Sequence, residues 1–188
     1  GIGLPAYYND EVIIPQLLSR GLTMAQARDY NIIGCVEPQK AAMTDGWHDA
    51  AFFNMCRPLE MVFTGGIDAG VRVAPETQSI RTMTSFEEFF EAYRQQMQYM
   101  ISMLVNADNA VDVAHSERCP LPFLSSMVDD CMARGKTVQE GGAVYNFTGP
   151  QGFGIANVAD SLWAIKKLVF EQRKYTLDDF AEALKCNF

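Results

Sequence analysis

The sequence lacks the features that mark several large classes of proteins. No apolar run approaches the roughly 18 residues that a membrane-spanning helix needs, and the start, GIGLPAYYND, has neither the basic residues nor the apolar centre of a signal peptide. Basic residues are not clustered, and 15 Lys and Arg against 23 Asp and Glu give a formal charge of −8. An electrostatic surface for nucleic acid is therefore missing. We expect a cytosolic protein that binds neither nucleic acid nor a membrane.

Cysteine is sparse, and its spacing argues against two common uses of the residue. The chain has 5 cysteines, an odd number, at wide spacings and without a CxxC pair. This pattern favours neither a disulfide framework nor a zinc site, so we expect reduced thiols and no bound metal. The chain also begins without methionine and stops at KCNF directly after a helical pattern, which suggests a piece of a longer protein.

What the sequence does have is a series of amphipathic helices separated by short extended or glycine-rich pieces. The clearest helix is expected from about 84 to 116, where apolar residues recur every three or four positions and Ser85 with Glu88 can cap the start. The pattern favours an α/β fold over an all-α fold. Further helices are expected over 10–21, 22–31, 48–66, 122–136, 157–172 and 176–188. Capping residues are expected at three helix starts: Thr23 with Gln26, Asn157, and Thr176 with Asp179. A strand is expected over 141–147 and a polar linker over 66–82.

The stretch IIGCVEPQ, residues 32–39, holds the first candidate chemistry. Pro38 favours an extended conformation for Glu37, and residues two apart in an extended chain project to the same side, so the Cys35 thiol and the Glu37 carboxyl would share one cavity at a buried loop tip. A carboxyl group among apolar residues has a raised pKa and is a candidate proton acceptor. A cysteine in an apolar loop is more often a small buried hydrophobe, and spacing alone favours that interpretation.

The segment TDGWHDAAF, residues 44–52, adds two acids and a histidine. His48 lies between Asp45 and Asp49, so it could be a general acid or the third member of a thiol site. The alternative is that Asp49 caps a following helix and His48 stands at its start. His115, near the end of the expected long helix, fits a partner of the helix dipole better than a catalyst.

The glycine-rich segment TGPQGFGIAN, residues 148–157, precedes an expected helix, as phosphate-binding loops do. Its glycines do not fit GxGxxG, and no lysine follows as in GxxxxGK[ST]. A tight turn with close backbone packing is the better interpretation.

Several of these motifs, in their order along the chain, resemble one family. GLPAYYND, GCVEPQ, GWHDAAFFN and GGAVYNFTGPQGFGIANVADSLWAIKKLVFE are similar to the middle-to-late portion of glycyl radical enzymes, in the branch of glycerol dehydratase, choline trimethylamine-lyase and trans-4-hydroxyproline dehydratase. The resemblance implies an α/β fold, a helix-rich partial segment of a ten-stranded barrel. Residues 1–188 would belong to the pyruvate formate-lyase-like barrel domain, with the C-terminal glycyl radical domain absent.

The resemblance also implies roles for individual residues. Cys35 would become a transient thiyl radical that abstracts hydrogen from a small hydroxylated substrate, and Glu37 would be the base during elimination. Asp49 would bind substrate hydroxyls, with His48 beside it. Pyruvate formate-lyase itself uses two adjacent cysteines, whereas this chain has a single cysteine flanked by Gly and Val, which points to elimination rather than acyl transfer. Whether a C–O, C–N or C–S bond breaks stays open.

The implied cofactor and partners lie outside this segment. The family stores its radical on a backbone glycine in an RVAGY-like loop, which the sequence does not contain, and a radical SAM iron-sulfur activase installs it. The expected partners are therefore a small-molecule substrate, the activase and a second copy in a homodimer, with no cofactor bound by residues 1–188. Two alternatives remain at this point: a catalytically inactive fragment or interaction piece, and a cysteine hydrolase that uses His48.

Overall fold

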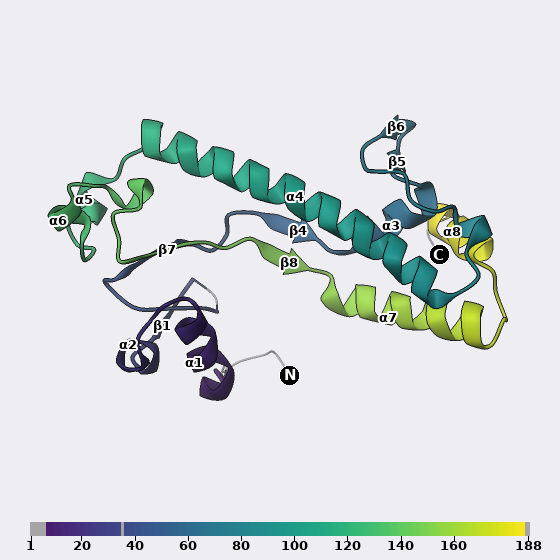
Figure 1. Ribbon diagram of the computed structural model, residues 1–188, viewed down its shortest axis with the longest axis horizontal. Helices are drawn as coiled ribbons and strands as arrows, with labels where there is room; N and C mark the ends of the chain where they lie inside the picture. Colours follow the sequence, from purple (N-terminus) through teal and green to yellow (C-terminus); the bar gives the residue numbers. More distant parts are fainter. Residues whose placement is uncertain (1–6, 35, 187–188) are drawn as a thin grey trace. The chain divides into compact units, whose positions relative to one another are not determined.

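The structure of the chain is a computed structural model that describes residues 7–34 and 36–186 (Figure 1). It forms two compact units, unit 1 with residues 1–50 and 110–149, and unit 2 with residues 51–109 and 150–188. The helix α4 (Phe86–Arg118) contributes to both, because the division falls within it. Within the described residues, every helix is too short or too polar to span a lipid bilayer.

Unit 1 begins with two helices, α1 (Asp10–Ser19) and α2 (Met24–Arg28), whose packing forms a small core. The Thr23 side chain and Gln26 form the predicted capping box at the start of α2. Gly21, with φ of 96°, makes the turn that follows α1. The buried members of the core are Ile13, Leu17, Leu22 and Ala27, and the partly buried Tyr145 and Phe147 pack against them.

The segments on either side of Cys35 pair as a hairpin. Strand β1 (Asn31–Ile33) pairs antiparallel with β2 (Glu37–Gln39), with Ile33 opposite Glu37, so the predicted loop tip is confirmed. The prediction that the tip is buried is wrong for this chain, since Gly34 is exposed and Val36 is 59% exposed. A two-stranded hairpin leaves its turn open unless another element covers it. Cys35 lies outside the described residues.

The rest of unit 1 is a parallel strand pair and three short helical pieces. Strand β3 (Thr44–Trp47) pairs parallel with β7 (Tyr145–Thr148). The strand predicted over 141–147 is therefore confirmed, although it begins only at Tyr145. The single helix predicted over 122–136 is wrong. It is replaced by α5 (Pro122–Ser125) and α6 (Cys131–Arg134), because Asp130 takes a left-handed conformation with φ of 72° between them. A single 3-10 turn, η2 (Val138–Glu140), follows.

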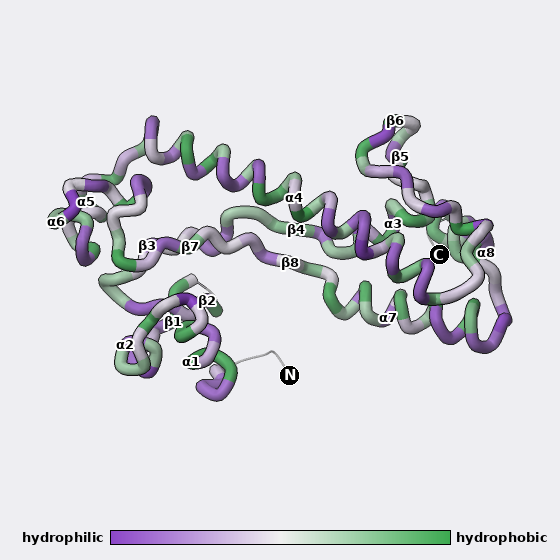
Figure 2. The backbone as a smooth tube through the Cα atoms, viewed as in Figure 1, coloured by the Kyte–Doolittle hydropathy of each residue, from purple (hydrophilic) through white to green (hydrophobic). Residues whose placement is uncertain are grey.

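Unit 2 is built on three longer helices and a second parallel strand pair. The helices are α3 (Cys56–Thr64), α4 up to Asn109 and α7 (Ile155–Ile165), which continues as a π-helical segment, η3 (Lys166–Glu171). Figure 2 shows apolar and polar residues alternating along α4, as the predicted amphipathic helix requires. The buried core residues are Leu59, Val62, Met83, Phe89, Ala92, Tyr93, Val158, Ile165 and Leu177.

Three expectations for unit 2 need correction. Residues 52–54, predicted as helix, form β4 (Phe52–Asn54), because they pair in parallel with β8 (Gln151–Phe153), far away in the sequence. Helix α7 begins at Ile155 after Gly154, so Asn157 is not its cap. The expected linker contains the hairpin of β5 (Ile67–Asp68) with β6 (Val71–Arg72) and a 3-10 turn, η1 (Ile80–Thr82).

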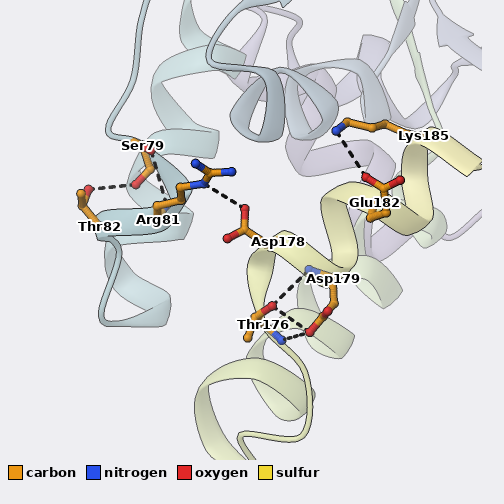
Figure 3. Close-up of polar contacts among 8 residues, drawn as sticks. All are labelled: Ser79, Arg81, Thr82, Thr176, Asp178, Asp179, Glu182 and Lys185. Carbon is orange, nitrogen blue, oxygen red and sulfur yellow. Dashed lines mark hydrogen bonds and ion pairs between the residues drawn. The ribbon is translucent and has the colours of Figure 1, made fainter.

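The last helix, α8 (Leu177–Cys186), confirms its predicted cap. The Thr176 N–H and hydroxyl both donate to Asp179 Oδ2 at 2.7 Å, and the Asp179 N–H donates back to the Thr176 hydroxyl at 3.1 Å (Figure 3). Arg81 in η1 pairs with Asp178 in the first turn of α8 at 3.3 Å. This exposed ion pair links two segments of unit 2 at a modest gain in stability.

Candidate active site

Three of the predicted site residues meet at one cavity in unit 1. The cavity has a volume of about 270 Å³, and Glu37, His48 and Asp49 lie in its wall. Glu37 comes from the start of β2, and the other two come from the turn that follows β3. Ile33, Gly34 and Trp47 complete the lining. The structure thus brings together residues that the sequence placed in separate motifs.

The Glu37 carboxyl folds back over the tip of the hairpin. Its Oε2 accepts a hydrogen bond from the Val36 N–H at 2.9 Å. A Cβ atom at position 34 would stand 2.6 Å from the same oxygen, and Gly34 has φ of 56°, a conformation that favours glycine. The glycine before Cys35 is therefore required for both the backbone turn and the position of the carboxyl. Whether the Cys35 side chain faces Glu37 stays a prediction, because Cys35 is outside the described residues.

His48 sits in a slot between two glycines. Its Nδ1 lies 3.0 Å from the Gly46 carbonyl oxygen, which can only accept, so Nδ1 carries the proton and Nε2 of the neutral ring is an acceptor. A Cβ at position 46 would overlap the imidazole ring, and one at Gly149 would stand 2.9 Å from His48 Cα. The Phe147 ring meets the imidazole edge-on, with 6.4 Å between centroids. These contacts fix where the ring lies.

Asp49 lies in the turn between β3 and β4. The next element after this turn is a strand, and α3 starts only at Cys56. The alternative in which Asp49 caps a helix and His48 begins it is therefore wrong. Asp49 lines the same cavity as Glu37, so it remains a candidate for contact with a ligand.

A second cavity of about 660 Å³ in unit 1 is lined by side chains of β3 and α4. The pKa of Asp45 is raised above its usual value, mainly by burial and then by the negative charge of Asp112, while His48 acts in the opposite direction. His115, in the last turn of α4 as predicted, packs edge-on against Trp47 with 5.2 Å between centroids. Asp45 lines this second cavity and is not among the residues that line the cavity at Glu37, His48 and Asp49.

Sequence reasoning missed Asp112. Its carboxylate accepts hydrogen bonds from the Trp47 indole at 2.8 Å and from the Thr148 hydroxyl at 2.9 Å. An acid on a long amphipathic helix usually belongs to the solvated face, and the sequence contains no local signal that Trp47 and Thr148 would meet it. The contacts appear only once β3, β7 and α4 are packed.

Comparison with known proteins identifies the family. A sequence model described as Pyruvate formate lyase-like matches residues 1–188. The chain belongs to this family of glycyl radical enzymes. Family and fold class are therefore as predicted, and the chain is a partial α/β segment of a glycyl radical enzyme barrel.

Individual relatives of this glycyl radical enzyme segment are dehydratases by name. A solved structure concerned with 1,2-propanediol dehydration in Roseburia inulinivorans is 65% identical with a TM-score of 0.95, and the match covers 100% of this chain and 24% of that chain. The B12-independent glycerol dehydratase from Clostridium butyricum is 56% identical with a TM-score of 0.95 and the same coverage. The (2S)-3-sulfopropanediol dehydratase of Klebsiella oxytoca is 40% identical over 190 residues, 100% of this chain and 23% of the relative. The chain thus spans about a quarter of the length of its relatives.

Proposed function

We propose that this chain is part of a glycyl radical dehydratase that removes water from a small diol or polyol. The observation that carries the proposal is the cavity at which Glu37, His48 and Asp49 converge, next to the hairpin tip that contains Cys35 in sequence. Three polar side chains around about 270 Å³ suit a small hydroxylated molecule. Identities of 65% and 56% to structures concerned with 1,2-propanediol and glycerol support the same substrate class.

The proposed reaction begins with transfer of a hydrogen atom from a hydroxyl-bearing carbon of the diol to the Cys35 sulfur. This leaves a neutral thiol and a carbon radical, whose hydroxyl is far more acidic than before, and Glu37 takes its proton. The neighbouring C–O bond then breaks, its electron pair leaves with the hydroxyl, and the proton held by Glu37 completes a water molecule. The carbon radical next to the new carbonyl takes the hydrogen atom back from Cys35, which yields an aldehyde.

Asp49 and His48 hold the hydroxyls of the substrate in this proposal. A carboxylate accepts a hydrogen bond from a hydroxyl, and a neutral His48 whose Nδ1 proton is directed to Gly46 offers Nε2 as a second acceptor. An acceptor built for a hydroxyl discriminates strongly against analogues without it, because its own polar group would then be unpaired. The pair would therefore select vicinal diols over molecules with a single hydroxyl.

The radical and its supply lie elsewhere in the proposed full-length enzyme. A backbone glycine outside residues 1–188 holds the glycyl radical that generates the Cys35 thiyl radical, and a radical SAM iron-sulfur activase installs it. The full-length protein is proposed to be a homodimer, and residues 1–188 are part of its barrel domain. Because the chain spans about a quarter of its relatives, we expect residues 1–188 alone to be inactive.

A substrate panel tests the proposed function. The full-length enzyme, activated without oxygen, is expected to convert 1,2-propanediol or glycerol to an aldehyde and to leave choline and isethionate unchanged. Trans-4-hydroxyproline, with one hydroxyl, should be a poor substrate at best. Product is measured by chromatography, and isolated residues 1–188 serve as a blank. Consumption of choline or isethionate with both diols untouched would overturn the dehydratase assignment, and dehydration of a diol without the activase would overturn the radical mechanism.

The slot that holds His48 gives a second test. Gly149→Ala in the full-length enzyme is expected to lower diol turnover at least about tenfold, since the new Cβ would press on the backbone at His48 and misplaced groups lose rate steeply. Gly152→Ala is the matched control, because its Cβ would meet only the flexible Met55 thioether, at 3.2 Å. Turnover is measured per glycyl radical. Equal rates for the two variants would mean that His48 does not have to be held in this position.

A further inference from the structure

We propose that Asp112 is a positioning residue for the candidate active site. It would act by holding the ends of β3 and β7 together, and so fixing the turn that carries His48 and Asp49. Asp112 is not among the residues that line the Glu37 cavity, so its effect is indirect. The expected effect on catalysis rests on the proposed function, whereas the positioning role is argued from geometry alone.

The first step is the contact between Asp112 and the two strands. Trp47 and Thr148 are the last residues of β3 and β7, and they are partners in the parallel register. The Trp47 indole N–H donates to Asp112 Oδ1 at 2.8 Å, and the Thr148 hydroxyl donates to Oδ2 at 2.9 Å. Each carboxylate oxygen thus binds one strand end. Hydrogen bonds to a charged acceptor are roughly twice as strong as neutral ones, so the contact resists separation of the strands.

The second step leads from the strand ends to His48. The residue after Trp47 is His48 itself, and the residue after Thr148 is Gly149, the glycine that leaves room for His48. The Gly149 N–H donates to the Trp47 carbonyl at 3.2 Å, which continues the strand pair by one more bond. Asp112 therefore binds the residue that directly precedes each of the two segments that position the imidazole.

The third step concerns the support behind the contact. Trp47 lines the cavity of about 660 Å³ together with Asp112, and it also lines the cavity that contains Glu37, His48 and Asp49. His115, one turn beyond Asp112 on α4, packs edge-on against the same indole. Two side chains of one continuous helix thus hold Trp47. Groups placed by a rigid element keep an active site within the narrow geometric limits that catalysis needs.

The experiment compares Asp112→Ala with Asp112→Asn in the activated full-length enzyme. The alanine variant is expected to lower kcat for the diol about tenfold per glycyl radical, as expected for displaced catalytic groups. Asparagine should restore kcat to within about threefold of wild type, because its oxygen accepts from Trp47 and its NH2 donates to Thr148. Glu117→Ala, which removes an exposed acid from the same helix, is the control.

Two further readouts separate positioning from a purely structural role. Thr148→Val should lower kcat by less than Asp112→Ala, and the double variant should be no slower than Asp112→Ala, because both changes disrupt one contact. A structural role alone would lower the melting temperature or the yield with an unchanged kcat per radical, and that result would overturn the proposal. Crystal structures of the wild type and the alanine variant compare the position of the turn at His48. An unmoved turn also overturns the proposal, whereas a wild-type enzyme inactive on every diol overturns only the proposed function.

Discussion

Replacing Cys35 with alanine in the full-length enzyme is expected to abolish diol dehydration while leaving the glycyl radical intact. The thiyl radical is the only group in the proposed mechanism that removes hydrogen from the substrate, and a methyl side chain cannot carry the radical in its place. We expect turnover to fall by on the order of 10⁴-fold or more, as when a residue that reacts directly is removed. Product formation is measured without oxygen, and electron paramagnetic resonance counts the glycyl radical in the same sample.

Two controls sharpen the result for Cys35. Cys35→Ser keeps the size and the polar atom of the side chain, but its O–H bond is stronger than S–H, so it should be as inactive as alanine. Cys186→Ala removes an exposed thiol from α8 in unit 2 and should keep full activity. A Cys35→Ala variant that retains the radical and still forms product would assign hydrogen abstraction to another residue. That outcome would remove the proposed role of Cys35 and leave the role of Glu37 as base to be tested separately.

Local chemistry explains which parts of the fold the sequence predicts well. The capping boxes at Thr23 with Gln26 and at Thr176 with Asp179 involve residues three apart, and both form as expected. The long helix α4 follows from its own periodicity. Likewise, Pro38 favours the extended conformation that Glu37 takes at the start of β2. Each of these features depends on a few neighbouring residues, so the sequence contains the whole cause.

Non-local pairing explains the errors. The aromatic residues of β4 look like part of a helix until β8, almost a hundred positions later, pairs with them. The break between α5 and α6 depends on the left-handed Asp130, and although aspartate adopts this conformation more readily than most residues, the sequence does not indicate which aspartate will do so. A strand partner or a tertiary constraint of this kind leaves no trace in a window of ten residues.

The candidate site likewise combines residues that the sequence predicts with residues that only the fold reveals. The motifs around Glu37 and at His48 and Asp49 were found from sequence, and their resemblance to a known family joined them before any geometry did. The supports of the site were not found, because the glycine slot at Gly46 and Gly149 and the Asp112 contact each join segments that are distant in sequence. Residues that react keep a recognisable type and order, whereas residues that support them are defined only by what they touch.

The remaining prediction concerns the base. Glu37→Gln in the full-length enzyme is expected to lower diol dehydration by about 10²–10⁴-fold, the usual contribution of a general base, while the glycyl radical still forms. Glutamine keeps the shape of the side chain and an oxygen that can accept from the Val36 N–H, so the hairpin should keep its conformation. The variant therefore separates proton transfer from packing, and the rate is measured per glycyl radical.

Two further substitutions, one at Glu37 and one at an exposed glutamate, provide the comparison for Glu37→Gln. Glu37→Asp retains a carboxylate on a side chain one methylene shorter, so it should recover part of the rate that glutamine loses. Glu117→Gln, an exposed position on α4, should match wild type. If Glu37→Gln dehydrates the diol as fast as wild type, another group moves the proton. The carboxyl would then serve only to fill the space left by Gly34 at the hairpin tip, and the slow step would have to be sought in hydrogen abstraction instead.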